Sequence, residues 1–528
     1  MVQLEETTYH ELLQARQSHA EENLLLKAEN QWLKEQLGLA KLRLYAPSSE
    51  KTPIGQEQML FNEAEACAAP EAPEPETETI TYTRRKTTAP RGYQREIQLE
   101  NLPVEEVVYT LPEEEQVCPA CTGPLHEMGQ DVRREIKIVP AQFILVRHIC
   151  SKYACRNCNR NEIKTPIVAA PMPVSAFPNS LASPSAVAYI MSQKFVEGMP
   201  LYRQAQNLLR QGLPLSRQTM ANWMITGATW LEKLYSLLKK ELCRRDVAHA
   251  DETTLQVLNE EGRKAQQTSY MWLYRSGRDG PPIVLYEYQE TRAGEHPRAF
   301  LKDFRGFLHV DGYQVYETLP NVTPVGCWSH ARREFFDALS ILTPLERQKA
   351  ETAAAKGLDF CNKLFAIERD LENATPEERF AGRQARSQPL LLKFRIWLDD
   401  MAIQVLPKCA TGKAIRYCLN QWSKLIAFME DGRLEISNNR AERAIKPFVI
   451  GRKNWLFSTS TCGAKASATI YSLIETAKEN GLNPLVYLDY LFQQLPNIDV
   501  RHPKTLDLLL PWSDPVQVKC RVPSKSNR

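Results

Sequence analysis

The sequence predicts a multidomain protein of the α/β and all-α classes, in which one α/β domain is interrupted by a helical insertion and preceded by smaller modules. Three observations predict this class. The chain has 528 residues, which is too long for a single hydrophobic core. Its hydrophobic period changes from helical to strand-like after Leu242, and is mostly helical again from Arg333 to Glu430. Two Cys-x-x-Cys pairs precede this region.

The composition is that of an ordinary globular protein, with 43% hydrophobic and 24% charged residues. A net charge of +3 is close to neutral, so any contact with nucleic acid must come from local clusters of positive charge. The N-terminus is polar and acidic, unlike a signal peptide, and no apolar run approaches the length of a membrane span. Thirteen cysteines without an export signal fit a reducing compartment. We therefore expect a cytoplasmic protein that does not enter a membrane.

Residues 1–46 are expected to form a coiled-coil helix. One heptad position holds Leu12, Leu26, Leu33 and Ala40, and the other holds Asn23, Asn30, Leu37 and Leu44. Asparagine at a buried core position costs stability but selects a parallel dimer in register. The pattern predicts self-association as a homodimer or higher oligomer. A single amphipathic helix docked on its own protein remains the alternative.

Residues 47–95 are rich in Pro, Ala, Glu and Thr and are expected to be a largely disordered linker. Residues 96–170 then contain the two Cys-x-x-Cys pairs, Cys118 with Cys121 and Cys155 with Cys158. Two such pairs carried on hairpins place four thiolates around one tetrahedral Zn²⁺. We therefore predict a zinc ribbon with a structural zinc ion. The alternative is two unrelated pairs of buried cysteines.

Residues 171–243 are expected to be helical and to contain a helix-turn-helix. One amphipathic helix ends at Gln211-Gly212, and Ser216 is placed to cap the next helix. That second helix carries Arg217, Gln218 and Asn222, whose side chains suit base edges and phosphates. An ordinary helical hairpin is the alternative.

Residues 244–334 are expected to form the first part of an α/β domain. The segments DVAHADETTLQVL, SYMWLYRSG and PIVLYEYQ read as three antiparallel strands, and PRAFLKDF reads as a short helix. A strand in GFLHVDGYQVY and a strand followed by a helix in VGCWSHARREFFDAL come next. This is the order of elements in an RNase H-like sheet, in which the first and fourth strands are neighbours. Asp251 lies on the first strand and Asp311 at the end of the fourth.

Neighbouring carboxylates about 4 Å apart repel each other by several kcal/mol, and a divalent cation turns this repulsion into attraction. Oxygen ligands with open positions suit Mg²⁺ or Mn²⁺, and two such ions can promote phosphoryl transfer.

A third carboxylate is expected after a helical insertion at 335–433, in the last part of the domain at 434–478. The candidates are Glu442, which we predict to be the third ligand, and Glu435, which we expect to be a solvated loop residue. Asn439 and Glu442 also have the spacing of a helix capping box, which would be a structural role for Glu442.

The ordered set HADET (249–253), HVDGY (309–313), GCWSHARREF (326–335) and SNNRAERAIKPFVIGRKNWLFS (437–458) resembles transposases of the insertion sequence 66 family, from bacterial mobile elements. The likeness extends from SSEK at 48–51 to NGLNPLVYLDYLFQQLP at 480–496, within a C-terminal helical segment and tail at 479–528. Tyr45-Ala46-Pro47 stands where relatives often have a Phe-Gly pair.

The resemblance implies a DDE-type recombinase that cuts DNA at the ends of the element and joins the 3′-hydroxyls to target DNA without a covalent enzyme intermediate. It implies two Mg²⁺ or Mn²⁺ ions at Asp251, Asp311 and a third acid, small accessory proteins as possible partners, and a nucleoid-associated protein. The residues expected to contact DNA beside this site are His330, Arg443, Lys446, Arg452, Lys453 and Trp455, although His330 and Trp455 also suit core positions. Another RNase H-like nuclease and a catalytically silent DNA-binding regulator are the alternative functions.

Overall fold

The structure is a computed structural model that describes single residues of the N-terminal segment (Arg16, His19, Glu22, Leu26 and Leu33) and residues 142–154, 167–340 and 352–523. The single N-terminal residues are helical, and Leu26 and Leu33, seven residues apart, are 50% and 54% exposed. The linker at 47–95 and the four cysteines predicted to bind zinc lie outside the described residues. The chain divides into two compact units, 1–46 with 150–522, and 47–149 with 523–528. The elements below belong to the first unit.

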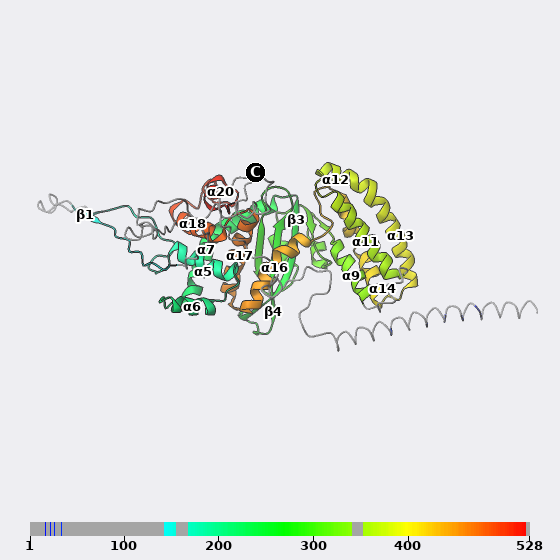
Figure 1. Ribbon diagram of the computed structural model, residues 1–528, viewed down its shortest axis with the longest axis horizontal. Helices are drawn as coiled ribbons and strands as arrows, with labels where there is room; N and C mark the ends of the chain where they lie inside the picture. The colour runs from blue at the N-terminus through cyan, green and yellow to red at the C-terminus, as the bar shows by residue number, and fades with distance from the viewer. Residues whose placement is uncertain are drawn as a thin grey trace, which may run out of the picture. The chain divides into compact units, whose positions relative to one another are not determined.

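A six-stranded mixed sheet forms the centre of this unit (Figure 1). The strands are β3 (Val247–Asn259), β4 (Thr268–Ser276), β5 (Val284–Gln289), β6 (Gly306–His309), β7 (Val322–Val325) and β8 (Ser458–Ser460). Their order is β5-β4-β3-β6-β7, and β8 pairs with the far end of β3. The pairs β3–β4 and β4–β5 are antiparallel, whereas β6, β7 and β8 run parallel to β3. The strands expected from the sequence are present, and the first and fourth of them are neighbours.

Two edges of β3 are used differently. Along one edge of β3, residues 248–256 pair with β4. Along the other edge, residues 247–249 of β3 pair with β6 and residues 257–259 pair with β8. Within the described chain, residues 250–256 therefore have no strand beside them on that second edge. The first residues of β3, Val247–Ala250, are buried, and burial becomes partial at Asp251. The sheet thus opens at the first candidate aspartate.

Helices cover both faces of the sheet because its central strands are apolar on both sides. On the face that carries Asp251, the ring of Tyr286 in β5 packs against Phe448 in α16 (Asn439–Trp455) and Tyr471 in α17 (Thr461–Glu479). On the opposite face, Tyr274 stacks on Phe300 of α8 (Glu295–Phe300), with ring centroids 3.8 Å apart. One continuous core joins these layers.

The helices before and after the sheet pack together. They are α5 (Pro184–Phe195), α6 (Leu201–Arg210), α7 (Arg217–Cys243), α18 (Pro484–Gln494), α19 (Pro503–Asp507) and α20 (Asp514–Cys520). A two-stranded hairpin, β1 (Lys152–Ala154) and β2 (Ile167–Ala169), precedes them. As expected, Ser216 caps α7, because its hydroxyl accepts the Thr219 N–H at 3.0 Å. The helix α7 has 27 residues, and its buried residues reach from Met220 to Leu242, so it also serves as a core element.

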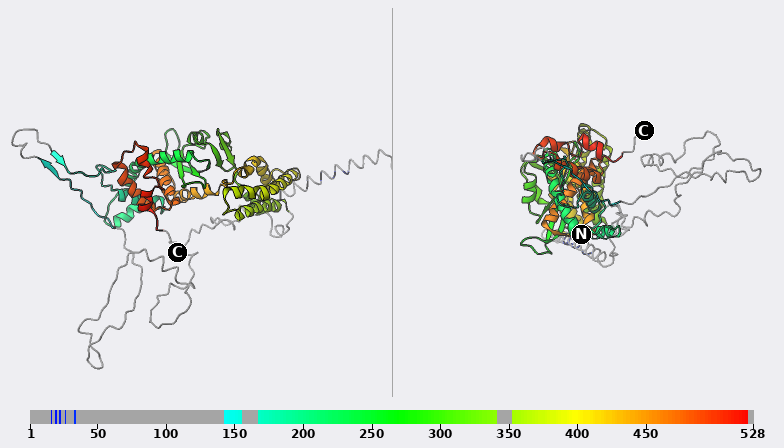
Figure 2. Two further views of the ribbon diagram at one scale, coloured as in Figure 1. Left: turned by 90° about the horizontal axis from the view of Figure 1, so that it is seen from above. Right: turned by 90° about the vertical axis from the view of Figure 1, so that its left-hand side faces the viewer.

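The segment between β7 and α16 is helical, as predicted, wherever the structure describes it. Its elements are α9 (Trp328–Ser340), α11 (Ala353–Asp370), α12 (Pro376–Gly382), the π-helix η3 (Arg383–Ser387), α13 (Gln388–Gln404), α14 (Ala410–Asn420) and α15 (Trp422–Ile426). These helices share a second hydrophobic core that includes Trp328 and Phe335 of α9 and Phe394 of α13. The boundary predicted between 334 and 335 thus falls inside α9, whose apolar side belongs to the insertion. In Figures 1 and 2 the yellow helices of this insertion form a bundle beside the green strands.

Buried Arg383 joins the insertion to the chain that returns to the sheet. Its guanidinium pairs with Glu368 at 2.7 Å and donates to the carbonyls of Phe428, Asp431 and Leu434. These bonds fix the path of the chain directly before Glu435 and α16. None of the helices in the described segments is long and apolar enough to cross a membrane.

Candidate active site

The pairing of β3 with β6 brings the two aspartates together. His249 of β3 lies opposite His309 of β6 in register, and each aspartate follows its histidine by two residues. Because side chains alternate along a strand, Asp251 projects from the same face of β3 as His249. Asp311 lies two residues beyond the end of β6, and its charge acts on the carboxyl group of Asp251. The imidazole rings are stacked with centroids 4.3 Å apart, and both are fully buried. Burial lowers the pKa of His249 to about 4 and holds the pKa of His309 well below its usual value, so both rings are neutral at pH 7.

The carboxyl group of Asp251 is in an unfavourable position for a negative charge. Its pKa is raised from 3.8 to about 8, mainly by burial and in addition by the charges of Glu252, Asp311 and Glu442. The opposing contribution is one hydrogen bond, in which Asp251 Oδ1 accepts the Glu252 N–H at 2.9 Å. Asp311 Oδ1 likewise accepts the Tyr313 N–H at 2.9 Å. The three predicted acids therefore interact electrostatically at the open end of β3.

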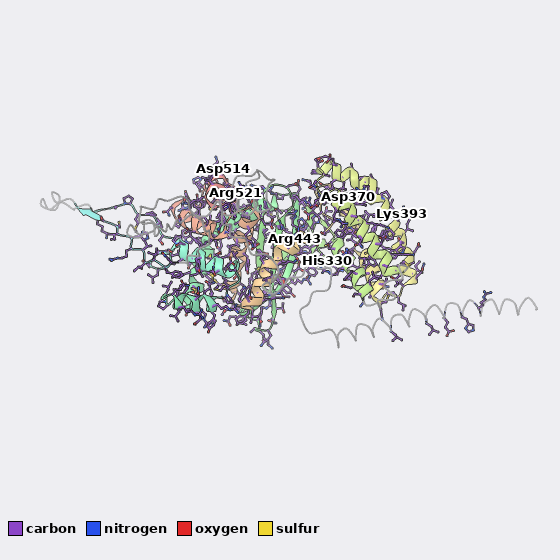
Figure 3. The ribbon with its side chains drawn as sticks, in the orientation of Figure 1. His330, Asp370, Lys393, Arg443, Asp514 and Arg521 are labelled. Carbon is purple, nitrogen blue, oxygen red and sulfur yellow. The ribbon has the colours of Figure 1, made fainter. Side chains whose placement is uncertain are left out.

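Glu442 lies in the first turn of α16 and is not used as a helix cap. The helix is capped by Asn438, which makes no capping side-chain bond, so the capping box considered for Asn439 and Glu442 is wrong. Glu442 Oε1 is buried without a hydrogen-bond partner, and His330 Nδ1 lies 3.9 Å from it. Figure 3 labels His330 on α9 and Arg443, the residue that follows Glu442 on α16. The unpartnered oxygen leaves Glu442 available to a ligand.

Glu435 has a structural environment, and the expectation that it is a solvated loop residue is wrong. Its side chain is 12% exposed and pairs with Arg278 at 2.8 Å and Arg440 at 2.7 Å. Its backbone N–H points to His309 Nε2 at 3.3 Å. Burial raises the pKa of Glu435, but the guanidinium groups of Arg440 and Arg278, which both donate hydrogen bonds to its carboxylate, hold the pKa well below its usual value. Because these partners already satisfy its charge, Glu435 is a poorer candidate for a metal ligand than Glu442.

Glu252, next to Asp251, points to the other face of the sheet. It accepts a hydrogen bond from Tyr316 at 2.7 Å and pairs with Arg292, whose guanidinium lies over the Tyr313 ring. This network anchors the loop that follows Asp311. Sequence analysis missed these residues, although the tyrosines at 313 and 316 follow the aspartate closely.

Asn438 is the residue that ties the three parts of the site together, and sequence analysis assigned it no role. Its amide oxygen contacts His249 Nδ1 at 3.0 Å, and its amide nitrogen donates to the Ala250 carbonyl at 2.8 Å, on the unpaired edge of β3. Its backbone N–H donates to Cys327 Sγ at 3.2 Å, directly before α9. One buried side chain thereby fixes the start of α16, with Glu442, against the strand that carries Asp251. The adjacent asparagines in SNNR were the signal that could have found it.

Asn438→Ala is expected to destabilise the protein by about 2–4 kcal/mol, because it leaves a buried imidazole nitrogen and a buried carbonyl unpaired. It is also expected to weaken divalent-metal binding, because Glu442 is no longer held against β3. Urea unfolding and calorimetric titration with Mn²⁺ measure the two effects. Asn439→Ala is the matched control. Equal stability and equal Mn²⁺ affinity of the two variants would show that Asn438 does not hold the site together.

Asp251, Asp311 and Glu442 carry oxygen donors, the kind that Mg²⁺ and Mn²⁺ prefer. Their ligand atoms are not among the described groups that lie within 4.8 Å of one another, so a bound cation would have to draw the three carboxylates together. Burial raises the pKa of Asp251, and Glu442 Oε1 has no hydrogen-bond partner, so a bound cation would stabilise both carboxylates.

A second group beside the acids contains softer ligands. These ligands are Cys327, His330 and Glu442. Each offers one sulfur, nitrogen or oxygen atom, and these three atoms lie within 4.8 Å of one another. Burial raises the pKa of the Cys327 thiol to about 11, so the sulfur is protonated in the metal-free protein.

The predicted DNA-contacting side chains occupy two regions. Arg217, Gln218 and Asn222 are exposed on the first two turns of α7. Arg443 and Lys446 are exposed on α16, the helix of Glu442, and Lys453 is exposed in its last turn. Arg452 instead donates to Thr254 Oγ1 of β3 at 3.0 Å. Trp455 is half-buried and packs on Phe448 with ring centroids 5.6 Å apart, which favours the core alternative for this residue.

The fold and the acids define an α/β protein with a candidate divalent-metal site on its sheet. The chain belongs to the IS66 family of transposases: residues 179–466 match "Transposase IS66 family", which confirms the resemblance seen in the sequence. Residues 115–159 match "zinc-finger binding domain of transposase IS66", which spans all four predicted zinc cysteines. Residues 472–512 match "IS66 C-terminal element", and residues 32–107 match "Transposase C of IS166 homeodomain", across the end of the predicted coiled coil and the predicted linker.

Similar proteins occur in Sinorhizobium fredii (strain NBRC 101917 / NGR234). The uncharacterized protein y4jD is 31% identical over 414 residues, which are 76% of this chain and 78% of the relative. The uncharacterized protein y4hP is 28% identical over 505 residues, which are 90% of this chain and 88% of the relative. These relatives extend the likeness over nearly the whole chain.

Proposed function

We propose that the protein is a DDE-type DNA transposase that binds the ends of an insertion element, cleaves DNA there and joins the 3′-hydroxyl ends to target DNA. The observation that carries this proposal is the electrostatic interaction of Asp251 on β3 with Asp311, just beyond the adjacent strand β6, and with Glu442 on the helix α16. All three lie inside the span that matches the transposase family.

The order of the strands supports an RNase H-like catalytic domain. Three antiparallel strands in chain order are followed by two parallel strands added beside the first, which gives the order β5-β4-β3-β6-β7. The insertion lies after the fifth strand and before the helix with the third acid. In an RNase H-like domain, this connectivity would bring the acids of the first strand, of the end of the fourth strand and of the late helix to one site.

Asp251, Asp311 and Glu442 would hold two Mg²⁺ or Mn²⁺ ions. Bound ions of this kind activate a water or 3′-hydroxyl nucleophile and stabilise the leaving oxygen of an in-line phosphoryl displacement. The chain's own contribution is to hold the carboxylates in place. The stacked neutral histidines keep β3 and β6 in register. The hydrogen bonds of Asn438 to His249 and to the Ala250 carbonyl fix the start of α16, and with it Glu442, against β3.

A basic cavity beside the acids offers a path for a DNA strand. It has a volume of about 320 Å³ and is lined by Ser329, Arg332, Asn362, Phe365, Arg369 and Asn439, without a carboxylate. Ser329 precedes His330, and Asn439 lies three residues before Glu442. Arg332 Nε donates to the Asn362 amide at 2.8 Å, and no carboxylate pairs with Arg332 or Arg369 among the described residues. These two guanidinium groups, with Arg443 and Lys446 on α16, suit DNA phosphates.

Arg332→Ala and Arg369→Ala are expected to weaken binding of element-end DNA. Each variant should also reduce the slope of log affinity against log salt by about one, because one DNA phosphate is no longer neutralised by the protein. Fluorescence anisotropy at several salt concentrations measures both effects. Arg395→Ala is the matched control on the insertion, because Arg395 already pairs with Asp399 at 2.9 Å. Unchanged affinity and slope in both cavity variants would place the DNA elsewhere.

The proposed activity is tested with labelled DNA that carries the ends of the element and a target duplex. The protein is expected to cleave and join these DNAs with Mg²⁺ or Mn²⁺ and not with EDTA. Cleavage without joining would favour another RNase H-like nuclease. End-specific binding without cleavage would favour a catalytically silent DNA-binding regulator.

The remaining partners follow from this proposal. Arg217, Gln218 and Asn222 at the start of α7 would contact the terminal repeats, and Cys118, Cys121, Cys155 and Cys158 would hold the structural zinc. Pairing of two element ends calls for a homodimer or higher oligomer through residues 1–46. Small accessory proteins of the same element would complete the complex, and its chromosomal substrate would place it at the nucleoid in the cytoplasm.

A further inference from the structure

The side chains of Cys327, His330 and Glu442 converge where the start of α9 meets the start of α16. Their ligand atoms lie within 4.8 Å of one another. His330 Nδ1 and Glu442 Oε1 are 3.9 Å apart, and both atoms are buried without a hydrogen-bond partner. Two unpaired polar atoms that face each other at this separation are unfavourable unless a third group comes between them.

The ligand types identify that group. A thiolate, an imidazole and a carboxylate form a mixed sulfur, nitrogen and oxygen set that suits Zn²⁺ and is a poor match for Mg²⁺. Three protein ligands leave the fourth tetrahedral position to water, as in open zinc sites. The Asn438 N–H donates to Cys327 Sγ at 3.2 Å, and a hydrogen bond of this kind orients a metal-binding sulfur. The side chains of His330 and Glu442 are 30% and 28% exposed, so an ion from solution can reach them.

We propose that Cys327, His330 and Glu442 form a second metal site, selective for Zn²⁺ and similar soft divalent cations, and that its occupancy inhibits the transposase. The inhibitory part rests on the proposed function, because it requires Glu442 to be the third catalytic acid. A Zn²⁺ ion that draws the Glu442 carboxylate toward Cys327 and His330 moves it away from the oxygen-only site beside Asp251. Zinc would therefore compete with Mg²⁺ by withdrawing Glu442, and abundant free zinc would silence the enzyme.

The test compares full-length wild-type protein with Cys327→Ser, which keeps a hydrogen-bond acceptor at this position. Cys361→Ser is the matched control, because Cys361 is also fully buried in the core that α9 shares with the insertion and lies outside the cluster. Zn²⁺ is titrated against a chromophoric chelator. Wild type and Cys361→Ser are expected to bind one zinc ion per chain more than Cys327→Ser, or to bind that ion roughly 100-fold more tightly.

A second arm measures strand transfer with Mg²⁺ at rising Zn²⁺. The zinc concentration for half-inhibition is expected to rise at least about tenfold in Cys327→Ser and to stay unchanged in Cys361→Ser. Equal zinc binding by wild type and Cys327→Ser would overturn the site. A lost zinc ion with unchanged inhibition would overturn the competition and place the inhibitory ion directly at the catalytic acids. The binding arm needs no catalysis, so a protein without strand transfer would refute the proposed function while the zinc site is still decided.

Discussion

Asp251→Asn is expected to abolish metal-dependent strand transfer, by about a thousandfold or more, and at the same time to stabilise the metal-free protein at pH 8. Activity falls because the variant lacks one of the carboxylates that hold the divalent ions. Stability rises because the neutral amide removes a charge that burial and the neighbouring Glu252, Asp311 and Glu442 make unfavourable. Loss of activity together with a more stable fold is the result expected if Asp251 is placed for function at a cost in stability of the metal-free protein.

The stabilisation has a defined pH dependence. The pKa of Asp251 is about 8 in the folded protein and 3.8 as its ordinary value. Between these values the folded state binds the proton more tightly than the unfolded state, so wild-type stability falls as the pH rises from about 4 to about 8. Urea unfolding with EDTA at pH 5 and pH 8 is expected to show a larger loss for wild type than for Asp251→Asn. Exposed Asp337→Asn on α9 is the control. Equal losses of stability in wild type and Asp251→Asn would mean that the charge of Asp251 does not destabilise the metal-free protein.

Glu442→Gln and Glu435→Gln are expected to separate chemistry from stability. Glu442→Gln should abolish strand transfer with little loss of stability, because its Oε1 has no partner to lose. Glu435→Gln should retain strand transfer but destabilise the fold by about 1–2 kcal/mol, because it weakens the ion pairs with Arg278 and Arg440. This figure is lower than for a deeply buried pair, since the Arg278 side chain is 41% exposed.

Strand-transfer rates and urea unfolding at pH 7 test the pair. The stability difference between wild type and Glu435→Gln should shrink as the pH falls below about 4.5, because the low pKa of Glu435 contributes stability only while the carboxylate is charged. If instead Glu435→Gln is inactive and Glu442→Gln is active, the roles of the two acids are exchanged. If both variants are inactive and stable, Glu435 has a part in the chemistry that its two ion pairs do not suggest.

Much of the fold follows from local patterns in the sequence. The switch from helical to strand period after Leu242 marks β3, and the apolar segments that follow mark β4, β5 and β6 in their observed order. Asp251 and Asp311 stood out because each interrupts or ends an otherwise buried strand, and Ser216 was recognisable as a helix cap. These features depend on residues within a few positions of each other, so periodicity and capping rules are sufficient to find them.

The sequence by itself determined the order of the elements, the two aspartates and the short list of third acids. Only the tertiary structure distinguishes Glu435, which pairs with two arginines, from Glu442, whose Oε1 has no hydrogen-bond partner. The distinction depends on Arg278, 157 residues before Glu435, and on Asn438, which reaches His249 across 189 residues. The tertiary structure also shows that Asn439 and Glu442 do not form a capping box, and that Cys327 and His330 lie beside Glu442. The physical reason is that the charge state and availability of a carboxylate depend on which groups surround it in space, and long-range packing brings those groups together.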